Sequence, residues 1–187
     1  MWLICILIVL LLCLVEKRFG DTRRLEQRKV FKDMILHVKR ENIPFLFISG
    51  DLYEQEYAKL STVEYINNLF KEIPNTKVFI SPGNHDPLLK NSFYNTFTWN
   101  ENVHIFGNEL GLYEFPEADI YGYGFEDFYL EGIDLSTIKI KNEDKINIFV
   151  VHGSLDASVT SEMKYNPMTT KELGKLGFDY IALRTYS

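Results

Sequence analysis

Three short stretches of the sequence carry side chains that bind metals or move protons. The stretches are ISGDLYE (48–54), ISPGNHDP (80–87) and VVHGS (150–154). Each one follows a run of apolar residues and supplies a carboxylate, an amide or an imidazole: Asp51, Asn84, His85 and His152. Imidazole can act as an acid or a base near neutral pH, and a mixed set of Asp, Asn and His donors suits manganese, iron or zinc.

Each stretch has a plain structural explanation when it is taken alone. Gly50 and Asp51 are typical of a turn, and a single histidine such as His152 is more often hydrogen bonded than a ligand. The combination is more specific, because Asn84 and His85 stand side by side in a glycine-led turn between two prolines. If the three strand ends meet at one edge of a sheet, the sequence predicts a metal-dependent catalytic site there.

Alternating strands and helices are predicted to position these residues. A helical pattern from Asp21 onward repeats apolar residues at 31, 34, 35 and 38, and a second one covers about 56–73. Short apolar runs predict strands at 44–49, 77–81, 104–107, 119–124, 146–151 and 180–183, and a short helix at 169–176 precedes the last strand. This order indicates an α/β fold of layered sheets and helices.

Composition narrows the classes of protein that fit. The chain has 187 residues, 46% of them hydrophobic, and a net charge of −6. That charge gives no broad basic footprint for nucleic acid. Both cysteines, Cys5 and Cys13, lie in the apolar opening run, so the rest of the chain has no disulfide framework and no thiolate zinc site. We treat residues 1–20 as a separate apolar segment and residues 21–187 as one catalytic domain.

The stretches SGDLYE, SPGNHDP and VHGS resemble the calcineurin-like metallophosphoesterases. The longer FISPGNHDP, together with HIFG and GFDYIAL, is similar to the SbcD-type DNA-repair exonuclease branch of that family. The resemblance extends from about Asp21 to Leu183. It implies a β-sandwich flanked by helices, in an α-β-β-α order, and a dinuclear metal centre that hydrolyses phosphate esters.

The resemblance also implies a role for each candidate residue. Asp51 would bridge two divalent ions, Asn84 and His152 would bind the second ion, and His85 would stabilise or protonate the leaving oxygen without binding metal. Manganese is the first choice of metal, with iron or zinc as alternatives. The expected substrate is DNA; a small-molecule phosphodiester is one alternative, and a non-catalytic, membrane-tethered binding domain is another. The nuclease branch has an ATPase partner, and we do not extend the expectation of that partner to this chain.

Two motifs of the family are missing from the sequence. An Asp-x-His motif is expected near the start, where MWLICILIVLLLCLV stands, and a Gly-His-x-His motif is expected after YIAL, where RTYS stands. We therefore expect the domain to be incomplete at both ends and its activity to be impaired. Synonymous codons for both ends can be written so that a shifted reading frame spells the missing motifs, which favours a frameshift at each end.

The expected location of the protein in the cell depends on how the apolar run at the start of the sequence is interpreted. Its 14 consecutive apolar residues, Trp2 to Val15, fall short of the roughly 20 that a spanning helix needs. It also lacks the basic start and the small-residue cleavage site of a signal peptide. We predict a cytoplasmic protein, with anchoring through residues 2–15 as the alternative.

Overall fold

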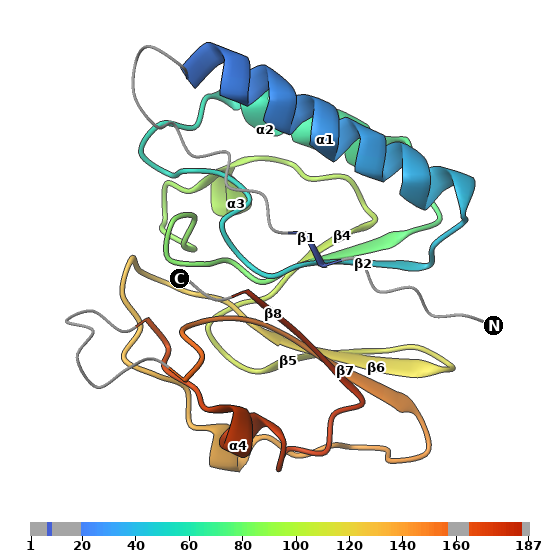
Figure 1. Cartoon of the computed structure of the whole chain (residues 1–187), viewed down its shortest axis with the longest axis vertical. Coiled ribbons are helices and arrows are strands. Elements are labelled where there is room, and N and C mark those ends of the chain that lie inside the picture. The colour runs from blue at the N-terminus through green and yellow to red at the C-terminus, as the bar shows by residue number, and fades with distance from the viewer. Residues whose placement is uncertain (1–6, 9–19, 157–164, 185–187) are drawn as a thin grey trace.

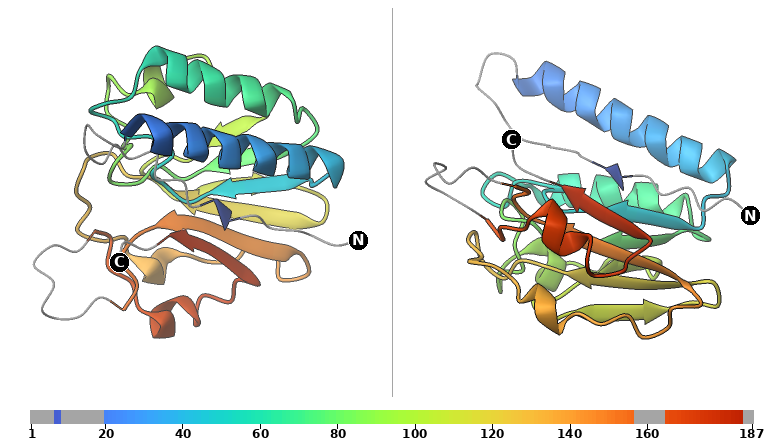
Figure 2. Two further views of the ribbon diagram at one scale, coloured as in Figure 1. Left: turned by 45° about the horizontal axis from the view of Figure 1, so that its top comes forward. Right: turned by 60° about the horizontal axis from the view of Figure 1, so that its bottom comes forward.

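The computed structural model describes residues 7–8, 20–156 and 165–184, with side chains from Leu25 onward. Two four-stranded sheets face each other, and helices cover the outer face of each sheet (Figure 1). The further views in Figure 2 show the same layers, with the two long helices side by side on one sheet. The predicted α/β sandwich flanked by helices is therefore confirmed.

The first sheet is entirely parallel, in the order β1-β2-β3-β4. Its strands are β1 (Leu7–Ile8), β2 (Phe45–Ile48), β3 (Lys77–Ile80) and β4 (Val103–Ile105). The helices over it are α1 (Gly20–Arg40) and α2 (Leu60–Lys71), and a short helix α3 (Phe93–Thr96) follows β3. Because parallel strands end at the same edge, the turns that follow β2 and β3 lie next to each other.

The second sheet is mixed, in the order β5-β6-β7-β8. Its strands are β5 (Gly111–Glu114), β6 (Ala118–Tyr123), β7 (Ile146–His152) and β8 (Tyr180–Arg184). Only the β5–β6 pair is antiparallel. The outer face is covered by the short helix α4 (Thr170–Leu173) and the 3₁₀ turn η1 (Leu135–Thr137).

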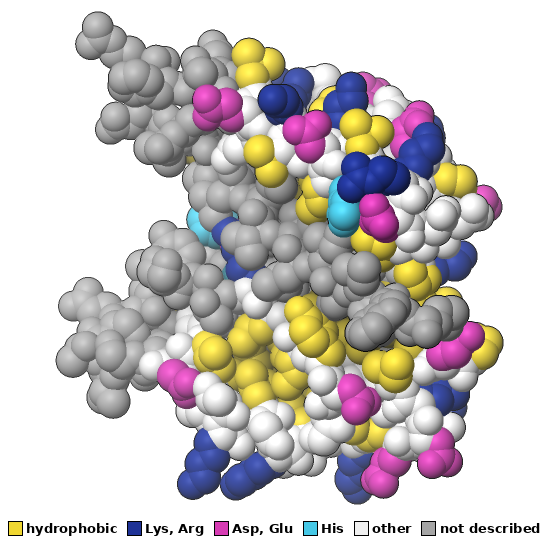
Figure 3. Space-filling view, turned by 45° about the vertical axis from the view of Figure 1, so that its right-hand side comes forward, with side chains coloured by type: hydrophobic (Ala, Val, Ile, Leu, Met, Phe, Trp, Pro, Cys, Tyr) yellow, Lys and Arg dark blue, Asp and Glu magenta, His cyan; other side chains and the backbone are white. Residues whose placement is uncertain are grey.

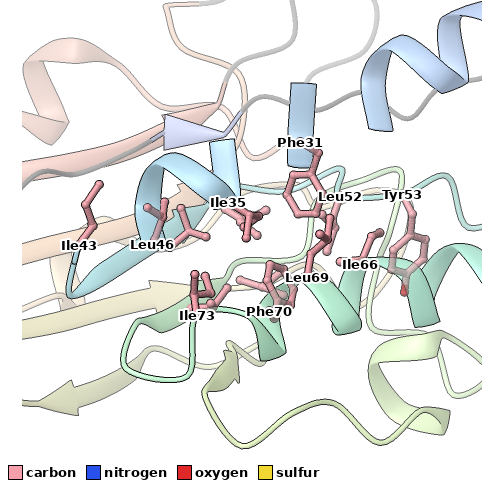
Figure 4. Close-up of a cluster of buried hydrophobic side chains, with 14 of the residues drawn as sticks. Phe31, Ile35, Ile43, Leu46, Leu52, Tyr53, Ile66, Leu69, Phe70 and Ile73 are labelled. Carbon is pink, nitrogen blue, oxygen red and sulfur yellow. The ribbon is translucent and has the colours of Figure 1, made fainter. Parts of the chain in front are cut away.

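Alternate residues of the central strands face different layers. In β2, Phe45 and Phe47 pack between the two sheets, whereas Leu46 and Ile48 pack under the helices. Figure 4 shows Leu46 among side chains from α1 and α2. Strands buried on both faces read as continuous apolar runs, which is why the sequence predicted β2, β3 and β7.

The structure differs from the sequence prediction at a few element ends. Helix α2 begins at Leu60 rather than near residue 56, because residues 54–58 form a turn in which Ala58 N–H donates to the Glu54 carbonyl. Helix α4 ends at Leu173 instead of near residue 176. Strand β5 was not predicted; it is short, begins with glycine and buries none of its residues fully.

Part of the opening run belongs to the first sheet. Leu7 and Ile8 form β1 and pair in parallel with Phe47 and Ile48 of β2. The rest of the predicted apolar segment, residues 1–6 and 9–19, lies outside the described residues. In the described part of the chain, no helix is long and apolar enough to cross a membrane.

Candidate metal centre

The four candidate residues come together where three strands end. Asp51 follows β2, Asn84 and His85 follow β3, and His152 is the last residue of β7. His152 Nε2 lies 2.8 Å from Asn84 Oδ1 and 3.8 Å from Asp51 Oδ2. The His85 backbone N–H donates to Asp51 Oδ1 at 3.2 Å. The turns of one sheet thus meet the end of a strand from the other.

Two glycines allow this close approach. A Cβ at Gly50 would lie 2.6 Å from His152 Nδ1, and a Cβ at Gly83 would lie 2.6 Å from Asp51 Oδ1. Gly50 also has φ +87°, a conformation that other residues rarely adopt. Asp51 itself has φ +54°, and positive φ at a non-glycine residue concentrates at functional sites.

His152 is held so that its ring presents an acceptor to Asn84. Nδ1 lies 3.0 Å from the carbonyl oxygen of Ser49, which can only accept, so Nδ1 carries the proton. Burial lowers the pKa of His152 against the opposing effect of the Asp51 carboxylate, which favours the neutral ring. Nε2 then faces Asn84 Oδ1, a second acceptor at 2.8 Å, and a cation or a proton between the two atoms would satisfy both of them.

A carboxylate without an assigned role in the sequence analysis organises both turns. Asp86 is fully buried and accepts four hydrogen bonds. Oδ1 accepts from the backbone N–H groups of Asp51 and Gly83, at 2.9 and 2.7 Å, and Oδ2 accepts from Leu52 N–H and the Tyr94 hydroxyl, at 2.7 and 2.6 Å. Burial and the nearby Asp51 raise the pKa of Asp86 to about 7, against the effect of these donors. The sequence signal for this residue was its place as the last residue of the GNHD stretch.

Glu54 positions the second histidine of the site. Its Oε2 lies 2.8 Å from His85 Nδ1, so the carboxylate accepts a hydrogen bond from that nitrogen and fixes the orientation of the ring. Both side chains are largely shielded from solvent, with exposed fractions of 15% for Glu54 and 26% for His85. Glu54 is the last residue of SGDLYE, one of the stretches that carry the family resemblance.

Arg184 is a further residue of the site that sequence reasoning missed. Its guanidinium Nη2 lies 3.3 Å from Asp51 Oδ2, and its side chain is 5% exposed. Arg184 is the last residue of β8 and pairs in register with His152 of β7. A motif of the family was expected at RTYS, which begins with Arg184, but the contact of Arg184 with Asp51 could not be read from the sequence, because it depends on the register between these two strands.

The remaining histidines lie outside the cluster. His104, in β4, stacks on Phe79 with ring centroids 5.1 Å apart and also contacts Tyr113. His37, on α1, is hydrogen bonded to Arg40. A hollow of about 490 Å³ is lined by residues between Ile133 and Leu176, and none of the candidate residues lines it.

Asp51, Asn84 and His152 present three donor atoms that could hold one divalent ion. Two ligands of an ion with bonds of about 2.1 Å at right angles lie about 3 Å apart, comparable to the 2.8 Å between His152 Nε2 and Asn84 Oδ1. Asp51 Oδ2 supplies a third, buried donor that accepts no hydrogen bond from the described residues. Over these same residues, no three His, Cys, Asp or Glu side chains gather in a way that could hold an ion.

Comparison with known proteins identifies the family of the chain. The family model for calcineurin-like phosphoesterases matches residues 19–182. The chain is also 28% identical, over 160 residues, to the uncharacterized metallophosphoesterase YhaO of Bacillus subtilis strain 168. That match covers 81% of this chain and 38% of YhaO, so the chain spans well under half the length of this relative. Because the family model covers most of the sequence, this protein belongs to the calcineurin-like phosphoesterase family.

Proposed function

We propose that this chain is a metal-dependent phosphodiesterase of the SbcD-type nuclease branch and that its substrate is DNA. The observation that carries the proposal is the convergence of Asp51, Asn84 and His152, from three strand ends, on one buried point. A carboxylate, an amide oxygen and an imidazole nitrogen are a donor set that binds manganese, iron or zinc. Manganese is our first choice among these ions.

Some residues of the site would bind the metal ion, and another would transfer a proton. Asp51, Asn84 and His152 would hold the ion. When bound, such an ion lowers the pKa of a coordinated water and neutralises charge on a phosphate. His85, oriented through the hydrogen bond from Nδ1 to Glu54, would hold a proton for the leaving oxygen. The donors described here suffice for one ion, and we therefore expect slow turnover.

DNA is favoured as substrate by three sequence stretches, one of which contributes residues to the cluster. FISPGNHDP, HIFG and GFDYIAL are similar to the nuclease branch, and the first of these contains the turn that presents Asn84 and His85. The surface favours a smaller phosphodiester as the second candidate. The net charge is −6, and basic and acidic side chains are interspersed on the described surface in Figure 3, whereas faces that bind DNA are usually basic. We also propose a cytoplasmic location. We propose no protein partner.

The proposal is tested with two substrates and matched variants. Purified protein is incubated with manganese and either blunt duplex DNA or a chromogenic phosphodiester. We expect slow hydrolysis that stops when metal is chelated and is lost in Asp51→Asn, but is retained in Asp33→Asn, which removes a carboxylate from the exposed face of α1. Hydrolysis of the chromogenic ester without hydrolysis of DNA would support the second candidate. Equal rates for Asp51→Asn and Asp33→Asn would refute the site.

A further inference from the structure

Arg184 is a buried cation in direct contact with the proposed metal site. Its Nη2 lies 3.3 Å from Asp51 Oδ2, and the exposed fractions of the two side chains are 5% and 2%. Its Nη1 donates to the carbonyl oxygen of Gly50 at 3.5 Å. The backbone also fixes this position, because Gly153 N–H donates to the Arg184 carbonyl beside His152. A charge buried to this degree is stable only when it is paired.

Arg184 contacts the same oxygen that a divalent ion would use. Asp51 Oδ1 already accepts the His85 backbone N–H, so Oδ2 is the oxygen left for an ion. Among the described residues, Oδ2 accepts no hydrogen bond, and its ion-pair partners are Arg184 at 3.3 Å and His152 at 3.8 Å. A divalent ion and a guanidinium cannot both lie against one buried oxygen without strong mutual repulsion.

We propose that Arg184 is an internal counter-cation that competes with a divalent ion for Asp51. The ion pair satisfies the buried carboxylate, and binding of an ion requires the guanidinium to move away from Oδ2. Affinity for metal is therefore reduced by the free energy needed to break this ion pair. This inference rests on the proposed metal site and adds a residue that controls how tightly the site binds its ion.

The test is a calorimetric titration of the full chain with manganese alone. Arg184→Gln removes the competing charge and keeps a polar, although shorter, side chain. We expect it to tighten manganese binding by about 10-fold to 100-fold over the wild type, the usual range for coupling between two binding events. The matched control is Arg40→Gln, which removes the same charge from an exposed position on α1 and should leave the affinity unchanged.

Several results would overturn the proposal. Equal or weaker manganese binding by Arg184→Gln contradicts competition and leaves the metal site of the proposed function intact. Weaker binding of inorganic phosphate by that variant, with unchanged manganese affinity, would instead assign Arg184 to the substrate phosphate. If neither the wild type nor Arg184→Gln binds manganese, this proposal and the proposed metal site both fail.

A second measurement needs no metal and covers the case in which Arg184→Gln does not fold alone. Asp51→Asn and Arg184→Gln each leave one buried charge without its partner, whereas the double variant leaves none. We expect the double variant to unfold at a higher urea concentration than Arg184→Gln, or to restore folding if that single variant is unfolded. Strictly additive losses, or a double variant that also fails to fold, would contradict a direct ion pair.

Discussion

Asp86 gives the sharpest prediction about how the site is held together. Its carboxylate accepts hydrogen bonds from three backbone N–H groups and one hydroxyl, all buried. Two of the N–H groups belong to Asp51 and Gly83, so this one side chain fixes both turns that form the site. A graded series of substitutions removes these bonds in steps: Tyr94→Phe, Asp86→Asn and Asp86→Ala.

The expected losses follow from the number of donors left without an acceptor. Tyr94→Phe removes one hydrogen bond and should cost about 1 kcal/mol. In Asp86→Asn the remaining oxygen can keep two backbone donors and the amide can donate to Tyr94, so one N–H loses its acceptor, at about 1–2 kcal/mol. Asp86→Ala leaves three backbone N–H groups without a partner. Relief from the buried charge offsets part of that cost, which should be about 3–5 kcal/mol.

The assay is urea unfolding at a pH above about 7, where the Asp86 carboxylate is ionised. The free energy of unfolding is compared with that of Asp33→Asn, which removes a carboxylate at an exposed position and should change stability by less than about 0.5 kcal/mol. If Asp86→Ala were as stable as this control, or if the three losses did not rise in the stated order, the role assigned to Asp86 would be wrong.

Three further changes test other parts of the molecule. Burial lowers the pKa of His104 below its ordinary value of 6.5, so the unfolded chain takes up a proton at this residue before the folded chain does as the pH falls. The wild type should therefore lose stability relative to His104→Gln below about pH 6.5. A stability difference in urea unfolding that stays constant with pH would contradict this. Gly83→Ala places a Cβ 2.6 Å from Asp51 Oδ1 and should cost about 1–3 kcal/mol of unfolding free energy, and an unchanged value would show that the turn can relax. The amide of Asn102 donates to three carbonyl oxygens at 3.0–3.2 Å. Asn102→Ala should therefore lower the thermal midpoint by the equivalent of about 1–3 kcal/mol. An unchanged midpoint would show that water replaces the amide.

Sequence reasoning predicted the strands that position the site and the chemistry at their ends. Strands β2, β3 and β7 are buried on both faces, so their apolar runs were recognisable as strands; glycine-containing turns with Asp51, Asn84 and His85 follow β2 and β3, and His152 ends β7. Asp51, Asn84, His85 and His152 were chosen for their side-chain types, and the structure brings all four together.

The missed features depend on contacts between residues far apart in the sequence. The four donors around Asp86 come from three separate segments, and no local pattern reveals them. The position of Arg184 follows from the register that pairs it with His152 across β7 and β8. A shift of that register by one residue would turn the Arg184 side chain to the other face of the sheet.

The most direct test of the account is manganese-edge anomalous diffraction from crystals of the full chain grown with excess manganese. We expect an anomalous peak within bonding distance, about 2–2.5 Å, of Asp51 Oδ2, Asn84 Oδ1 and His152 Nε2, with Arg184 turned away from the carboxylate. The result that would contradict it is a map without a peak at these three atoms, in which Arg184 still lies against Asp51.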